Sequence, residues 1–173
     1  MAKTRSRGVV FTIVAAVAVV GAGVAVADEP QSAMTSAPRV RLKPAEIAWP
    51  SSRAQDVAGS SMQPAVESLV VFGDASRPGL YSIMFRVRPG ATIPAHSHPD
   101  DRSCFVLTGV WFFGYGDRYS EKALRALPAG SHYTEPAHVN HFAATRRTGA
   151  VAECTSIGPT GTTFAERADD PRH

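Results

Sequence analysis

The sequence predicts an all-β domain, either a sandwich or a barrel. Three observations support this fold class: runs of alternating or continuous apolar residues that are four to fourteen residues long, turn signals rich in Gly and Pro between them, and no segment long enough for a βαβ crossover. The chain has 173 residues, enough for one domain with a buried core. We therefore expect a single β-domain.

The predicted strands follow one another from residue 67 onward. The segments that we expect to be extended are 67–73, 80–88, 103–116, 128–136, 139–145 and 149–158, with a break at Gly109 in the longest. Residues 117–127 have some helical propensity, which is compatible with a single helical turn or a polar loop. About eight strands at this spacing are typical of a closed or double-layered β-fold.

The first 27 residues have the pattern of an export signal. Three basic residues precede an almost wholly apolar run over 9–26, and Ala25-Val26-Ala27 has the small-x-small pattern of a cleavage site. The alternative, an uncleaved membrane anchor, is disfavoured by this site and by two glycines in the apolar run. We expect a secreted or periplasmic protein with no membrane attachment after cleavage. Residues 28–65 are predicted to be a flexible leader with an edge-strand segment around Ile47 and Trp49, and residues 159–173 a C-terminal tail.

Removal of this signal makes the chain electrically neutral. The full sequence has 18 basic and 15 acidic residues, and the signal takes away three basic ones, which leaves 15 of each. Binding to nucleic acid through its phosphates requires a basic surface, so a nucleic-acid partner is not expected. The two cysteines, Cys104 and Cys154, form a disulfide or remain two small buried side chains.

Five of the six histidines lie between residues 96 and 141. His96 and His98 are two positions apart, so in an extended strand their side chains project from the same face. Neutral imidazoles are good ligands for divalent Fe, Mn, Zn, Ni or Cu. A third histidine from another strand would complete a metal site with open positions for a substrate.

Two motifs resemble those of the cupin family of small β-barrels. Gly90, five residues, His96-x-His98, three residues, Arg102, six residues and Gly109 match the spacing of the first motif. The second motif is matched by Gly130, followed by Pro136 and His141 at the family's spacing. The resemblance covers residues 66–158 and implies a jelly-roll barrel with His96, His98 and His141 as metal ligands. It also implies a small-molecule ligand or substrate and, because many such barrels pair through edge strands, a homodimer as the expected assembly.

The chain departs from the family pattern at Arg102, where the first motif has a glutamate ligand. His138 and Thr145 likewise replace the glycine and asparagine of the second motif. A guanidinium is permanently charged and cannot bind a cation. At about 5 Å and an effective dielectric constant near 20, its repulsion of a dication is about 6–7 kcal/mol. If the metal site is retained, Arg102 must therefore point away from it or an acid must offset this charge.

Glu135 is the best candidate for this acid, because it lies one residue before Pro136 on a strand that should face the barrel interior. It either acts as a fourth metal ligand or pairs with Arg102 and orients it toward an anionic substrate group. The alternative is a barrel that has lost its metal and binds an organic ligand. Asp100 and Asp101 follow a proline, which is typical of an exposed turn.

The remaining polar and aromatic residues have either structural or functional interpretations. His138 is either a proton-transferring residue at the barrel mouth or a turn residue with an unusual backbone, and His132 is expected to be a surface residue. One or two rings of the aromatic run 111–115 are expected to line the pocket.

The predicted function is a metal-dependent enzyme of oxygenase, isomerase or lyase type that acts on a small anionic or phenolic molecule. Arg102, Glu135 and His138 would be its catalytic residues. The alternative is a non-enzymatic barrel that binds or senses a metal or a small ligand.

Overall fold

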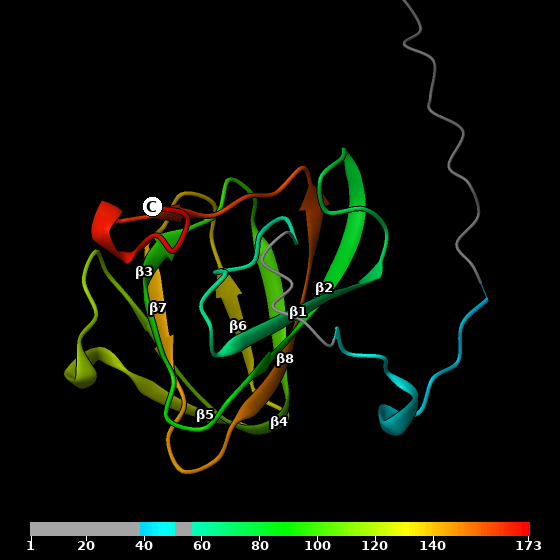
Figure 1. Cartoon of the computed structure of the whole chain (residues 1–173), viewed down its shortest axis with the longest axis horizontal. Coiled ribbons are helices and arrows are strands. Elements are labelled where there is room, and N and C mark those ends of the chain that lie inside the picture. The colour runs from blue at the N-terminus through cyan, green and yellow to red at the C-terminus, as the bar shows by residue number, and fades with distance from the viewer. Residues whose placement is uncertain (1–38, 51–56) are drawn as a thin grey trace, which may run out of the picture. The chain divides into compact units, whose positions relative to one another are not determined.

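The computed structural model describes residues 39–50 and 57–173. Within these two ranges, nine strands form one strongly curved antiparallel sheet (Figure 1). They are β1 (Val66–Phe72), β2 (Gly79–Val87), β3 (Thr92–Ser97), β4 (Arg102–Tyr115), β5 (Arg125–Pro128), β6 (His132–Glu135), β7 (His141–Ala144), β8 (Ala150–Gly158) and β9 (Thr163–Phe164). Their order is β1-β2-β8-β4-β7-β3-β9, with β5 and β6 also paired to β4. The all-β, jelly-roll-type prediction is confirmed.

Strand β4 joins the two halves of the sheet. Its first part pairs with β6 and β8, and its second part pairs with β5 and β7. The register shifts between Val106 and Thr108, and Gly109 follows with φ at +75°. A Cβ at Gly109 would lie 2.0 Å from the carbonyl oxygen of Gly149, so only glycine fits. This bulge bends β4, which allows one strand to serve both halves.

Alternation along the strands creates the interior. In the first part of β4, Arg102, Cys104 and Val106 are buried, whereas Ser103, Phe105 and Leu107 are exposed. Strand β8 follows the same rule, whereas β2 is buried on both faces over residues 81–84, with Tyr81 and Ile83 completely buried. The inward residues of all these strands form one hydrophobic core. Polar side chains that face inward from β4 and β6 are thus the exception and require partners.

Several segments differ from the predicted elements or extend them. The described part of the leader contains a 3-10 turn at Pro44–Glu46 and no strand, so the expected edge strand around Trp49 is not present there. Residues 117–127 form a 3-10 turn at Glu121–Ala123 followed by β5, because their short apolar alternation pairs with β4. Strand β9 pairs with β3 and extends the sheet beyond the predicted boundary at residue 158.

The predicted signal peptide lies outside the described residues, as does the leader up to residue 38. Among the described residues, no helix is both long enough and apolar enough to cross a membrane.

A disulfide joins Cys104 of β4 to Cys154 of β8. The two residues are directly opposite each other in the sheet register, and both are fully buried. Of the two alternatives that the sequence allowed, the structure has the disulfide and not two unpaired thiols.

Removal of this disulfide should strongly destabilise the fold. The bond closes a loop with a sequence separation of 50, for which loop entropy predicts a loss of about 4 kcal/mol in the free energy of unfolding. Urea denaturation of the Cys104→Ala/Cys154→Ala variant would measure it. Alkylation of the unreduced, denatured native protein serves as the control: two reactive thiols in that assay would contradict the bond.

Candidate metal centre

Three histidines from different parts of the chain converge inside the barrel. His96 is the next-to-last residue of β3 and is paired in the sheet register with His141, the first residue of β7. His98 follows directly after β3. The ring centroids are 4.5 Å apart for His96 and His141, 5.1 Å for His96 and His98, and 5.2 Å for His98 and His141. One ligand atom of each residue lies within 4.8 Å of the others. The predicted convergence is confirmed, and ligation itself stays a prediction.

Backbone carbonyls hold each imidazole in one orientation. Nδ1 is hydrogen-bonded to the carbonyl of Pro94 in His96 (2.7 Å), of Gly161 in His98 (2.7 Å) and of Val139 in His141 (3.1 Å). Because a carbonyl only accepts hydrogen bonds, each Nδ1 carries the proton and each Nε2 is left with a free lone pair. The same backbone contact fixes ring and tautomer in many metal-binding histidines.

Burial keeps the three rings neutral. All three are at least 94% buried. Desolvation lowers the pKa of His96 to about 3 and that of His141 to about 4, and it lowers the pKa of His98 well below its ordinary value. The Arg102 charge lowers all three further. The rings are therefore available as neutral ligands at physiological pH.

Glu135 brings a carboxylate to the same place. It is the last residue of β6, its side chain is buried, and burial raises its pKa. Its Oε2 lies 3.4 Å from Nε2 of His98, and its Oε1 lies 3.8 Å from Nε2 of His141. Nε2 of His141 is buried and has no hydrogen-bond partner among the described residues. Three imidazole nitrogens, a carboxylate and an unsatisfied buried lone pair fit a divalent transition-metal ion.

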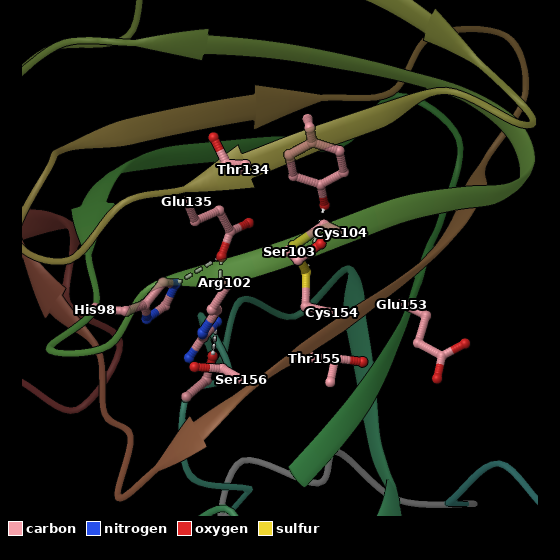
Figure 2. The surroundings of a disulfide bond; sticks show 12 residues. His98, Arg102, Ser103, Cys104, Thr134, Glu135, Glu153, Cys154, Thr155 and Ser156 are labelled. Atoms are coloured by element: carbon pink, nitrogen blue, oxygen red, sulfur yellow. Dashed lines mark hydrogen bonds and ion pairs between the residues drawn. A yellow bond between two sulfur atoms is a disulfide. The ribbon is translucent and has the colours of Figure 1, made fainter. Parts of the chain in front are cut away.

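Arg102 lies beside this carboxylate and is almost completely engaged by the protein. It is directly opposite Glu135 in the register of β4 and β6, and its Nη1 donates to Glu135 Oε2 at 3.3 Å (Figure 2). Nη1 also donates to the Gly59 carbonyl, and Nη2 donates to the Thr160 hydroxyl at 2.6 Å. Nε lies 3.5 Å from Asp100 Oδ2 but makes no hydrogen bond. The guanidinium therefore compensates and orients Glu135.

Asp100 is buried, so its predicted place in an exposed turn is wrong. Only Asp101 of the pair is exposed. The hydroxyls of Tyr81 and Thr160 donate to the Asp100 carboxylate, the former at 2.6 Å. Burial raises the pKa of Asp100, but these hydrogen bonds outweigh it and the net pKa is lowered. Asp100 thus supplies a second negative charge on the opposite side of Arg102 from Glu135.

The structure does not bring His138 into the cluster. Its side chain is exposed in the turn after β6, and its φ is +61°, the left-handed region that the family's glycine would adopt freely. The turn interpretation of this residue agrees with this position. His132 is exposed on β6 and contacts Ser103, as expected of a surface residue.

The cluster forms one side of a cavity inside the barrel. The cavity is narrow, and its empty volume of about 380 Å³ includes space that is open to solvent. Besides His96, His98, Arg102, Glu135 and His141, it is lined mainly by apolar side chains, which include Trp111 and Phe113 of the predicted aromatic run.

Sequence reasoning missed the contributions of two flanking segments. Gly59, with φ at +78°, packs against the guanidinium of Arg102, and a Cβ there would lie 2.3 Å from Nη2. Thr160 binds the same guanidinium from the predicted tail. Neither segment has a motif, and the Gly-Ser-Ser run at 59–61 was the only available signal.

The metal-free protein should lose stability as the pH falls. Below pH 6.5 the histidines of the unfolded chain take up protons, whereas His96 and His141 in the folded chain do not until about pH 3 and 4. The free energy of unfolding should therefore fall between pH 6.5 and 4, on the order of 3 kcal/mol for His141 alone. Proton uptake by buried Glu135 offsets part of this loss.

Urea denaturation in the presence of a chelator, measured from pH 7 to pH 4, tests this dependence. The His141→Leu variant should show a shallower slope. A free energy of unfolding that stays constant or rises as the pH falls would contradict burial of neutral rings.

Comparison with known proteins gives structural likeness only. No protein-family model and no curated protein matches the sequence. KdgF from a Halomonas species is 21% identical over 55% of this chain and 82% of its own, with a TM-score of 0.45. An RmlC-like cupin from Shewanella frigidimarina is 20% identical over 55% of this chain and 78% of its own, with a TM-score of 0.44. Salicylate 1,2-dioxygenase from Pseudaminobacter salicylatoxidans is 16% identical over 60% of this chain but only 31% of its own, with a TM-score of 0.49. The chain's own topology and its two converging histidine motifs are those of a cupin-type fold.

Proposed function

We propose that this protein is an exported metalloenzyme that binds one divalent transition-metal ion and acts on a small organic molecule. His96, His98 and His141 would hold the ion, and Glu135 would be its fourth protein ligand. The observation that carries the proposal is the buried, unpartnered Nε2 of His141, which faces two further neutral imidazoles and a carboxylate. This ligand set suits Fe, Mn, Zn, Ni or Cu.

The chain's own residues would divide the remaining tasks. The metal, when bound, supplies a Lewis acid that polarises an oxygen or lowers the pKa of a bound water. Glu135 has a raised pKa beside the Nε2 atoms, so it is also suited to accept a proton from a molecule in the cavity. Arg102 is a positioning residue that holds this carboxylate, because its Nη donors are occupied by protein groups. The exposed His138 has no part in the proposal.

Export is supported by two features. The first 27 residues have the basic, apolar and cleavage-site pattern of a signal peptide. The buried Cys104–Cys154 disulfide is typical of proteins in an oxidising compartment.

The second candidate is a barrel that binds a metal or small ligand without turnover. The narrow, mainly apolar cavity favours it, since few polar groups other than those of the cluster are available there to act on a substrate. The two candidates share the metal site and differ in turnover. A compound that binds the metal-loaded protein and is recovered unchanged would favour the binder.

The proposed metal site predicts the metal content of the native protein and how two substitutions reduce metal binding. The purified native protein should contain about one equivalent of a single transition metal by elemental analysis. His141→Ala should lose the metal, because two rings and a carboxylate remain, and Glu135→Gln should weaken metal affinity by about tenfold or more. His132→Ala is the matched control, since its ring is exposed outside the cluster. Unchanged metal content in His141→Ala would refute the site.

The pairing of Arg102 with Glu135 predicts how loss of the arginine changes stability with and without metal. Arg102→Gln removes the charge that compensates buried Glu135. The free energy of unfolding of this variant in the metal-free state should therefore be about 3–5 kcal/mol lower than that of the native protein. A bound dication replaces the lost charge, so the metal should stabilise this variant more than the native protein. Thermal denaturation with and without metal measures both effects. Equal stabilisation of the two proteins by metal would show that Glu135 does not respond to the ion.

A further inference from the structure

Besides Nε2 of His141 and Nε of Arg102, two polar groups line the cavity without partners. Nε1 of Trp111 and Oγ of Ser61 are buried, and neither has a hydrogen-bond partner within the described residues. Both residues are only 6% exposed. A buried donor without an acceptor is unfavourable and rare in folded proteins, so such a group indicates a molecule that binds there.

Trp111 shares its part of the cavity with the metal cluster. It is the next inward-facing residue on β4 before Phe113, whose ring stacks on His141 at 5.4 Å between centroids. Phe113 also contacts Tyr133, at 4.6 Å. Burial raises the pKa of the Tyr133 hydroxyl, and an interaction with the side chain of Trp111 lowers it, which places this hydroxyl near the indole. The indole N–H therefore faces the same interior space as the three histidines.

The chemistry of these groups restricts the ligand. An indole N–H can only donate, so the ligand atom that it meets must be an acceptor. The surrounding walls are apolar and include Val66, Phe85, Val87 and Ile93. Arg102 is the cation that lines the cavity, and its Nη1 and Nη2 already donate to Gly59, Glu135 and Thr160. Its Nε has no hydrogen-bond partner but lies 3.5 Å from the carboxylate of Asp100. Arg102 is thus already balanced by two buried carboxylates, so a ligand carboxylate would be repelled here, whereas a neutral oxygen with an apolar body would be accommodated.

We infer that the cavity selects a small, uncharged, largely apolar molecule that carries a carbonyl or phenolic oxygen, and that Trp111 and Ser61 are the specificity-determining residues that donate hydrogen bonds to this oxygen. The inference rests on the proposed function for what happens to the ligand, but the recognition itself requires no metal. It replaces the sequence-based expectation that Arg102 would select an anionic substrate.

A pair of matched probes tests this recognition. Cyclopentanone and methylenecyclopentane have nearly the same shape, and only the first has an acceptor oxygen. The chain has two tryptophans, so the Trp49→Phe variant leaves Trp111 as the single indole signal. Titration of the ¹⁵N-labelled variant should move the indole N–H resonance downfield with the ketone. The ketone should bind about fivefold to tenfold more tightly than the alkene.

Two variants test whether Trp111 and Ser61 cause the preference for the ketone over the alkene. Trp111→Phe removes the N–H and keeps an aromatic ring, so the preference for the ketone should disappear. Ser61→Ala removes the hydroxyl with little change in volume and should reduce the preference by about twofold to fivefold. Equal binding of the two probes by the Trp49→Phe protein, or no binding of either, would overturn the inference.

Titrations of metal-free and metal-loaded protein keep the two proposals apart. If the protein prefers the ketone but cannot be loaded with metal, recognition by Trp111 and Ser61 would be supported and the metal site would be rejected. Metal binding without any ketone preference would do the reverse. Tighter binding of cyclopentanecarboxylate than of cyclopentanone to the metal-free protein would also overturn the choice of an uncharged ligand.

Discussion

The compensation of a buried carboxylate is the constraint on which the site depends. Glu135 lies inside the barrel among neutral imidazoles, where an unpaired negative charge would cost several kcal/mol. The antiparallel register of β4 and β6 places Arg102 directly opposite it and supplies the required cation. Asp100 then balances Arg102 from its other side. The arginine that would disable a metal site on its own is thus part of a compensated group of charges.

This arrangement explains how the departure from the family pattern can be tolerated. At the motif position where the family that the sequence resembles has a glutamate, this chain has Arg102, and a carboxylate, that of Glu135, is at the facing position on the neighbouring strand. Because residues opposite each other in a sheet are only about 4.5–5.5 Å apart, such an exchange still leaves a carboxylate close to the histidines. The new carboxylate lies 3.4 Å from Nε2 of His98 in this structure. Its position then depends on the pairing of β4 with β6.

The disulfide stabilises the strand that carries this pair. Cys104 is the next inward-facing residue after Arg102 on β4, and its bond to Cys154 fixes β4 to β8 (Figure 2). The sulfur atoms and a Glu135 carboxylate oxygen lie within 4.8 Å of one another. Strand β4 is therefore fixed on both sides next to the charged group, by the covalent bond to β8 and by the ladder to β6.

The sequence was most informative where spacing determines geometry. Alternation along the strands and the two motif spacings predicted the β-fold and the convergence of His96, His98 and His141, because a strand projects every second side chain to the same face. The proximity of Glu135 to Arg102 was expected as one alternative for the same reason. The burial of Asp100 and the contacts of Gly59 and Thr160 with Arg102 depend on how flanking segments pack over the barrel. No local pattern encodes such long-range packing.

Anomalous X-ray scattering from crystals of the metal-loaded protein tests the central claim most directly. We predict a single peak that lies about 2.0–2.2 Å from Nε2 of His96, His98 and His141 and from one oxygen of Glu135. A peak bound by the three imidazoles but remote from Glu135 would limit this residue to pairing with Arg102. A peak elsewhere, or none, would contradict a metal centre in this barrel.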